Sequence, residues 1–97
     1  MSKYNFNTHS LTALTKDDID LLSKLTEGDC TALIEGLTVR IDGYYIIPYK
    51  RTDINIVCCL IAEKPVATFD EKKGVGLDSE GFEVGIYNDF ELVGSEE

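Results

Sequence analysis

The chain has 97 residues, with 18 Asp and Glu against 9 Lys and Arg, and its formal net charge is −9. This length suits a single domain over residues 1–97 with one modest core, and an apolar share of 43% argues against wholesale disorder. The negative charge repels nucleic acids and anionic membranes, so we expect neither as a direct partner. It favours a protein partner with a basic surface, or simply solubility.

The two ends of the chain differ from the rest. Residues 1–10 are polar and predict a flexible or docking segment, although Tyr4 and Phe6 alternate with asparagines as in a short strand. Residues 94–97 predict a frayed acidic tail. The longest apolar run, Ile56–Ala62, is far shorter than the ~20 residues of a membrane span.

Three cysteines, Cys30, Cys58 and Cys59, make a poor disulfide framework, since their number is odd and two are adjacent. Adjacent residues of a strand point to opposite faces, so Cys58 and Cys59 are not expected to bridge each other. Reduced thiols are typical of intracellular proteins, and the sequence therefore predicts a cytoplasmic, reducing location.

The first long element predicted is a helix over residues 16–27. Thr15 is a good N-cap, and Asp18 stands three residues later, as in a capping box. Apolar residues recur on one face of this segment, and Gly28 is well placed to end it. Residues 29–36 fit either a second short helix or a bulged strand, and a short helix or turn is slightly favoured.

From residue 37 onward the chain has the pattern of β-structure, beginning with a hairpin. Asp42-Gly43 is a strong signal for a type I′ turn, which needs positive φ at both central residues. A two-residue turn fixes two cross-strand pairs: Ile41 with Tyr44, and Val39 with Ile46. Pro48 cannot donate to a ladder, so the second strand ends there or lies at a sheet edge.

The most apolar stretch, Ile54–Glu63, predicts a central strand covered on both faces. Five further segments are predicted after it: a strand Val66–Phe69, a charged glycine-rich loop over 70–81, a strand Phe82–Tyr87, a turn at Asn88-Asp89 and a closing strand Phe90–Val93. The predicted fold is therefore α+β: one N-terminal helix packed on an antiparallel sheet of four to six strands, which could curl into a small barrel.

No group of residues has the sequence pattern of an active site or a metal centre. His9 is the single histidine, and the cysteines lack the C-x-x-C spacing of zinc sites. Cys30 follows Asp29, whose negative charge raises a thiol pKa and weakens the nucleophile. The sequence predicts no catalytic residue, no metal and no cofactor, and hence not an enzyme. An enzyme without a recognisable motif is the least favoured alternative.

The C-terminal fifth of the chain is strongly acidic. Residues 78–97 contain seven acids and neither Lys nor Arg. Alternate residues on a strand stand about 6–7 Å apart, close to the phosphate spacing along one DNA strand, so a row of carboxylates would fit a basic groove. The residues predicted to bind a partner in this way are Asp78, Glu80, Glu83, Asp89 and Glu91. The alternative is a charged face that only protects an edge strand from aggregation.

A second candidate surface lies on the outer face of the hairpin. If the paired residues point inward, Tyr45, Ile47 and Tyr49 point the other way, together with Arg40. A sheet with one solvated face should not expose two tyrosines and an isoleucine, and tyrosine is common at interfaces. These three residues are predicted apolar anchors. The alternative is a strand covered on both faces, by the helix and by the curling sheet.

Together these features favour a small acidic binding protein that occupies a basic site on a protein partner. No stretch matches a family motif, but in size, charge and fold class the chain is similar to virus-encoded inhibitors and nucleic-acid mimics that block a host nucleic-acid-binding enzyme. The alternative is a structural or self-assembling subunit of a larger particle, because edge strands and a two-sided apolar hairpin suit a homo-oligomer.

Overall fold

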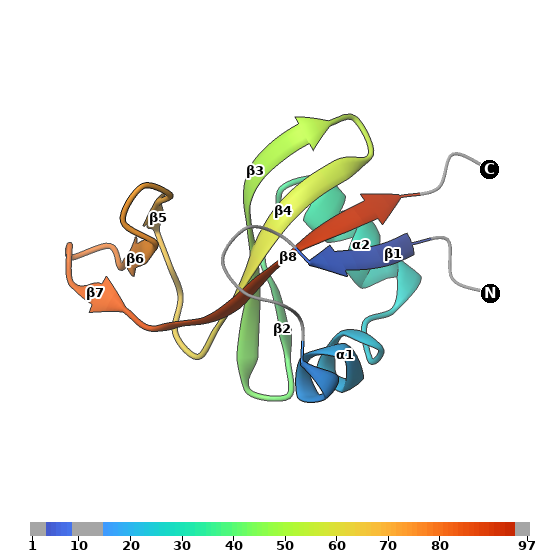
Figure 1. Ribbon diagram of the computed structural model, residues 1–97, viewed down its shortest axis with the longest axis horizontal. Coiled ribbons are helices and arrows are strands. Elements are labelled where there is room, and N and C mark those ends of the chain that lie inside the picture. Colours follow the sequence, from blue (N-terminus) through green and yellow to red (C-terminus); the bar gives the residue numbers. More distant parts are fainter. Residues whose placement is uncertain (1–3, 9–14, 95–97) are drawn as a thin grey trace.

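A computed structural model describes residues 4–8 and 15–94 of the protein (Figure 1). These residues form two helices and eight strands. In chain order they are β1 Tyr4–Thr8, α1 Lys16–Leu22, α2 Glu27–Ile34, β2 Val39–Ile41, β3 Tyr44–Asp53, β4 Ile56–Ala62, β5 Thr68–Asp70, β6 Val75–Leu77, β7 Glu83–Val84 and β8 Ile86–Gly94. Residues 1–10 are predicted as a flexible or docking segment with the alternation of a short strand, and the described part, β1, is a strand that pairs with β8. The remainder of the two predicted tails, residues 1–3, 9–10 and 95–97, lies outside the described residues.

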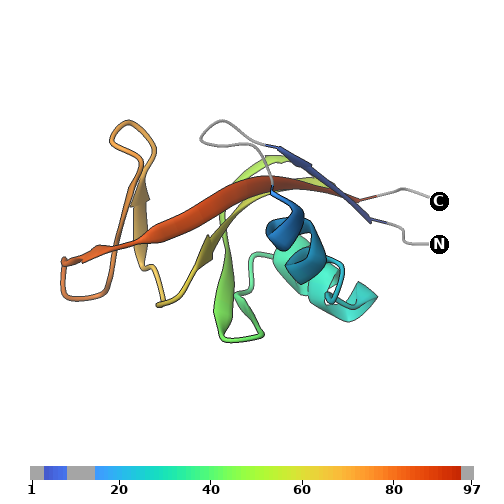
Figure 2. The ribbon, with the colours of Figure 1, turned by 60° about the horizontal axis from the view of Figure 1, so that its bottom comes forward.

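Five strands form one antiparallel sheet in the order β1-β8-β4-β3-β2 (the main sheet), which curls without closing into a barrel. Both helices lie on the same face of this sheet (Figure 2). β5, β6 and β7 form a separate three-stranded antiparallel sheet (the small sheet), at the opposite end of the molecule from α2 (Figure 1). The predicted α+β class and antiparallel main sheet are confirmed.

The predicted helix over residues 16–27 is too long, because α1 ends at Leu22 and α2 begins at Glu27; the short helix favoured for residues 29–36 is confirmed in α2. Thr15 caps α1 as predicted: its Oγ1 accepts a hydrogen bond from the Asp18 N–H at 3.2 Å, and Asp18 Oδ2 accepts one from the Thr15 N–H at 3.0 Å. Thr26 and Asp29 form a second capping box in the same way, so Gly28 lies inside α2 instead of ending α1. A second capping box starts a new set of intrahelical hydrogen bonds, and this local signal outweighs the continuous apolar pattern.

The predicted hairpin is confirmed, with both of its cross-strand pairs. Asp42 has φ 51° and Gly43 has φ 82°, the positive values that a type I′ turn requires. β3 continues past Pro48, but beyond Ile46 its only neighbour among the described strands is β4. Pro48 therefore lies in an edge segment, one of the two positions predicted for it, and the pairing register shifts beside it.

β4 is the middle strand of the main sheet, as its apolar sequence predicted, and its residues from Val57 onward are all buried. Its two faces belong to two apolar clusters. The helix-side cluster contains Leu21, Leu22, Cys30, Leu33, Ile46, Val57, Cys59, Ile61, Phe90 and Leu92. The junction cluster contains Ile47, Leu60 and Ala62 with Tyr45, Tyr49, Val66, Phe69 and Ile86. Cys59 packs under the helices and Cys58 faces the other way, as the alternation of a strand predicted.

The predicted loop over residues 70–81 is wrong in part, because it contains β6. Gly76, in the middle of β6, is buried. A Cβ at this position would stand 2.9 Å from Ile86 Cδ1 and 3.0 Å from Val66 Cγ1. Glycine therefore allows the small sheet to approach the junction cluster closely.

The predicted turn at Asn88-Asp89 does not form, because both residues lie within β8 and pair with β4. Their side chains have partners on opposite sides of the main sheet: Asn88 Nδ2 donates to Asp18 Oδ2, and Asp89 Oδ2 accepts from the Tyr49 hydroxyl. These partners make the buried polar residues compatible with a strand. One long strand, β8, thus replaces the end of one predicted strand and all of the next.

Candidate functional site

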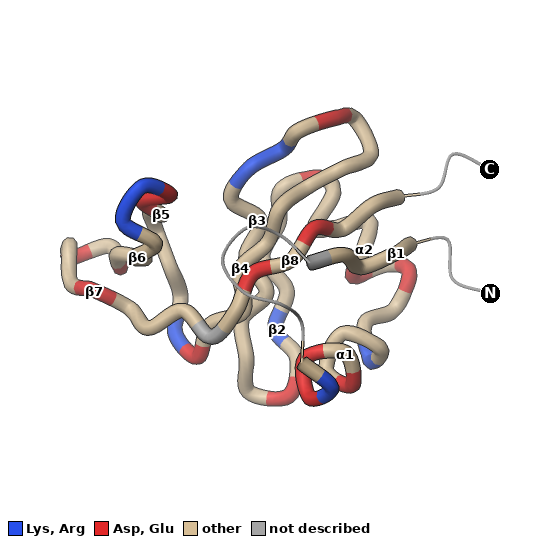
Figure 3. The backbone as a smooth tube through the Cα atoms, in the orientation of Figure 1, with Lys and Arg blue, Asp and Glu red and all other residues tan. Residues whose placement is uncertain are grey.

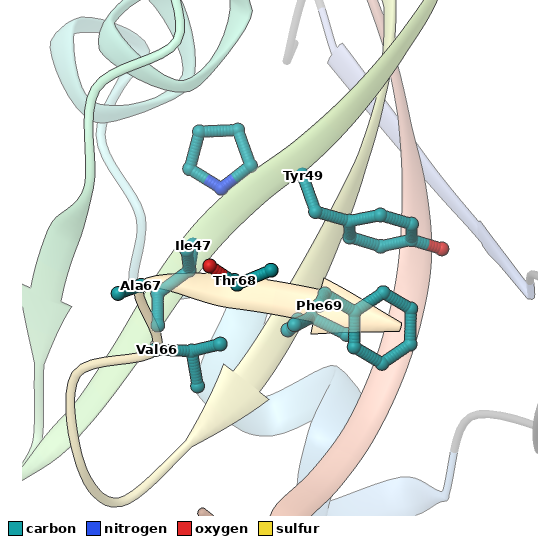
Figure 4. A pocket seen from close by; sticks show the side chains of 8 residues that line it. Ile47, Tyr49, Val66, Ala67, Thr68 and Phe69 are labelled. Carbon is teal, nitrogen blue, oxygen red and sulfur yellow. The ribbon is translucent and has the colours of Figure 1, made fainter. Parts of the chain in front are cut away.

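The three predicted anchors on the hairpin, Tyr45, Ile47 and Tyr49, point away from the helices but do not form an exposed surface. The chain between β4 and β5 folds back over them, and Val66 and Phe69 pack against them. Ile47 is 7% exposed, and the rings of Tyr49 and Phe69 meet edge to face with 4.7 Å between centroids (Figure 4). The strand is therefore covered on both faces. The small sheet and the chain leading to it supply the second cover, which was expected from the helix or from the curl.

A depression of about 190 Å³ remains at this junction (Figure 4). Its lining consists of Ile47, Pro48, Tyr49, Leu60, Val66, Ala67, Thr68 and Phe69. None of these residues is charged, and the volume is below the roughly 300–1,000 Å³ of typical small-molecule sites. We interpret this depression as a packing gap where two sheets meet.

Asp89, one of the five predicted binding acids, lies in the core of the main sheet. It is fully buried, and its Oδ2 accepts a hydrogen bond from the Tyr49 hydroxyl at 3.1 Å. Burial, and then the negative charge of Asp89, raise the pKa of the Tyr49 hydroxyl. Tyr49 therefore stays a neutral donor that satisfies a buried carboxylate. Asp89 is thus removed from the predicted surface.

None of the three cysteines has the surroundings of a nucleophile. All three are free and buried. Burial, and then the charges of Asp29 and Glu27, raise the pKa of the Cys30 thiol to about 11. Burial likewise raises the pKa of Cys58 and of Cys59. Thiols that stay protonated are weak nucleophiles and weak metal ligands.

Three of the predicted acids come together in the small sheet (Figure 3). Asp78 and Glu80 lie in the turn between β6 and β7, and Glu83 begins β7. Asp78 holds this turn, since its Oδ1 accepts hydrogen bonds from the N–H of Glu80 at 2.9 Å and of Phe82 at 3.0 Å. Glu80 and Glu83 are exposed. The structure thus assigns a structural role to one acid and leaves two carboxylates directed to solvent.

Glu91 lies apart from this group. It stands on β8 in the main sheet, opposite Cys58 of β4 and Asn7 of β1, and it is half-buried. The predicted row of five carboxylates therefore does not form. The physical reason is that β8 leads out of the small sheet and into the main sheet, whereas a hairpin at its polar residues would have kept the acids together.

The sequence reasoning missed Phe82, which it placed at the start of a strand. Phe82 stands between Glu80 and Glu83 and is 66% exposed. A signal was present, because Asp, Ser and Gly precede it and are typical of turns. The same turn forms one wall of a depression of about 400 Å³, lined by Lys64, Pro65, Val66, Ala67, Asp78, Ser79, Glu80 and Val84.

A second acidic region lies where α1 meets the hairpin turn. Asp17, Asp20 and Asp42 line a depression of about 230 Å³ together with Lys24. Lys24 forms an ion pair with Asp42, and this partner raises the pKa of the lysine. The exposed lysine neutralises part of the local charge, so this region attracts a cation less strongly than its acids alone would.

Within residues 4–8 and 15–94, no three His, Cys, Asp or Glu side chains are placed to hold a metal ion. In the same part of the chain, no helix is both long enough and apolar enough to cross a membrane. No protein-family model, no curated protein and no solved structure matches the chain. The features of the protein that bear on a function are the turn between β6 and β7 and the net charge of −9.

Proposed function

We propose that this protein binds a protein partner with a basic surface and acts by occupying that surface, as an inhibitor or nucleic-acid mimic does. The observation that carries the proposal is the turn between β6 and β7, where Glu80 and Glu83 stand exposed on a hydrogen-bonded backbone. The net charge of −9 attracts a basic partner over a distance, and the two exposed carboxylates then set its register.

The buried ionisable groups support binding over catalysis. Burial raises the pKa of Tyr49, Cys30, Cys58 and Cys59, and each of them is neutral when protonated. A tyrosine or cysteine that acts as a general base or nucleophile needs the opposite shift, toward its ionised form near neutral pH. These groups contribute to the core, and the exposed carboxylates of the turn are the groups that a partner can reach.

The proposal is tested by a charge reversal with a matched control. E80K/E83K reverses the two exposed acids in and beside the turn, whereas E27K/E35K makes the same change in net charge at the two ends of α2, at the other end of the molecule (Figure 1). A basic protein captured by the wild type and eluted in salt steps is then purified and titrated with all three proteins. We expect E80K/E83K to weaken binding by about tenfold or more, and the control by less than about threefold.

Two outcomes would contradict the proposal. Equal losses of affinity for the partner in both double variants would mean that net charge alone attracts the partner and that the turn is not the site. Unchanged affinity in both would mean that binding is not electrostatic. Circular dichroism of each variant checks that α2 and the sheets are still folded.

One observation favours a second candidate function, a self-assembling structural subunit. β1 is an edge strand of the main sheet, and no residue in Tyr4–Thr8 is charged. An uncharged edge strand lacks a common protection against pairing with a strand of another molecule. Light scattering at micromolar concentration tests this function: a homo-oligomer is expected for a subunit, and a monomer would contradict it.

A further inference from the structure

The two outer edges of the main sheet differ in how they are protected against pairing with another molecule. One edge is formed by β2, which has three residues, and by the part of β3 beyond Ile46. That part of β3 contains Pro48 and two shifts of pairing register. It also carries the exposed charges of Lys50 and Arg51. Short strands, proline, irregular pairing and charge are common means of preventing association between sheet edges.

The opposite edge, β1, has few of these protections. Its five residues, Tyr4–Thr8, include no charged residue and no proline, and they pair with β8 in an unbroken register. In the strand order of the main sheet, β1 has a neighbour on one side only. The backbone of residues 5–7 can therefore pair with a further strand on its outer side, as in recognition by strand addition.

Contacts with the helix-side cluster hold β1 in position. The Phe6 ring packs against the ring of Phe90, and the Tyr4 hydroxyl shares a hydrogen bond with Thr31 Oγ1 of α2 at 2.8 Å. Tyr4 and Phe6 are nevertheless only half-buried, so the helix-side cluster is partly open at this edge. A strand that is already ordered loses less entropy when it associates.

The sequence at the centre of β1 is symmetric. Asn5 and Asn7 flank Phe6, so the three residues Asn-Phe-Asn have the same order in both directions. Phe6 lies on the face that carries the helices, while Asn5 and Asn7 lie on the other face and are exposed. An antiparallel strand with the same sequence therefore matches β1 on both faces, and this match points to a second copy of the chain as the occupant of the edge.

We propose that β1 pairs antiparallel with β1 of a second copy across a two-fold axis at Phe6, which joins the two main sheets into one. The axis places Phe6 opposite Phe6 of the second copy, and Asn5 opposite Asn7 of the second copy. Cross-strand aromatic pairs and hydrogen bonds between amide side chains stabilise such pairing. This inference rests on the self-assembling function, the second candidate above, and adds the surface, the symmetry and the residues that meet.

The charge of the molecule favours this edge over other surfaces. Two copies that each have a net charge of −9 repel each other. β1 brings uncharged side chains together and so adds no local repulsion. The small sheet lies at the end of the molecule away from β1 (Figure 1), so pairing leaves the turn between β6 and β7 accessible.

The experiment measures the dimer dissociation constant of the full chain by sedimentation equilibrium. N5K/N7K places like charges opposite each other in both cross-strand pairs and should raise this constant by about fivefold or more, whereas N5E/N7K places opposite charges there and should lower it about two- to tenfold. E80Q/E83Q is the control: it changes the net charge by the same amount as N5K/N7K, but in the small sheet, and should not weaken the dimer. Added salt should strengthen the wild-type dimer because it screens repulsion between the copies.

The results separate this inference from the self-assembling function. A wild type that stays monomeric at micromolar concentration would contradict both. A dimer that neither N5K/N7K nor N5E/N7K alters would contradict pairing through β1 and leave self-assembly standing. Equal weakening by both variants would contradict the register with Asn5 opposite Asn7. Tighter association of N5E/N7K would support the register, and it cannot result from loss of folded protein.

Discussion

Different interactions stabilise the main sheet and the small sheet. The main sheet packs both helices against its middle strands, and the helix-side cluster alone contains ten buried residues. Within the strands of the small sheet, only Gly76 and Val84 are buried. Its shape depends on two aspartates whose side chains accept backbone N–H groups: Asp70, before β6, and Asp78, after it.

This difference indicates which sheet contributes most to stability and which one we propose for partner binding. A sheet with a large core keeps its shape when surface residues change, whereas turns fixed by local hydrogen bonds can present side chains to a partner. The small sheet is joined to the main sheet through the junction cluster, and its outer turn carries the exposed Phe82 with Glu80 and Glu83. The comparison can be tested by substitutions that affect one sheet and not the other.

The largest loss of stability is expected from a substitution in the helix-side cluster. Phe90 is fully buried there, and its ring meets that of Phe6 edge to face at 5.6 Å between centroids. F90A should lower the free energy of unfolding by about 3–5 kcal/mol, because it leaves a cavity in the core. The control F82A removes an exposed ring of the same type and should change stability by less than about 0.5 kcal/mol. Urea denaturation measures both, and similar losses would contradict the assignment of the core to the main sheet.

A smaller loss of stability is expected from a substitution where the two sheets meet. Y49F removes the hydroxyl that donates to the buried carboxylate of Asp89 while keeping the ring against Phe69. Loss of a hydrogen bond to a buried charged group should cost about 1.5–3 kcal/mol in the free energy of unfolding. Y45F, on the same face of β3, is the control and should cost less than about 0.5 kcal/mol. Equal values for the two variants would show that the Asp89 contact contributes little.

Packing of the small sheet is tested by adding one methyl group. G76A places a Cβ against Ile86 and Val66 and should cost about 1–2 kcal/mol, because the stiff valine side chain must move. Hydrogen exchange should become faster in β5–β7 and stay unchanged in β4. In G85A the added Cβ meets nothing within 4 Å, so this variant should exchange like the wild type. Faster exchange throughout G76A would mean that the two sheets unfold as one unit.

The smallest change in folding stability is expected from alkaline pH, and near neutral pH it is absent. In the folded state burial raises the pKa of Cys30 from about 9 to about 11, so between these values the unfolded chain has lost a proton that the folded chain keeps. The contribution of the protonated Cys30 thiol to the free energy of unfolding is thus fully present below about pH 9 and decreases as the pH rises toward about 11. Urea midpoints measured across this range should decrease, and C30A should reduce the slope. A midpoint that rises with pH would contradict the direction of the pKa shift.

Several elements followed from short stretches of sequence. Asp42-Gly43 determined a hairpin and its register, because few residues adopt positive φ in succession. The run of apolar residues in β4 determined the middle strand, since a strand covered on both faces cannot carry polar alternation. Thr15 and Asp18 determined the start of α1 through a capping box. In each case the interactions that decide the structure lie within a few residues.

Other features depended on partners that are distant in the sequence. Asn88 and Asp89 form a turn signal in isolation, but in the structure they pair with β4, and their side chains bond Asp18 and Tyr49. Tyr45 and Ile47 have the pattern of an exposed surface until the chain after β4 folds over them. The sequence by itself determined the acidity, the fold class and the strands that local chemistry dictates. The tertiary structure decided which acids face solvent and which aromatic ring stands among them, because burial depends on contacts that no short segment contains.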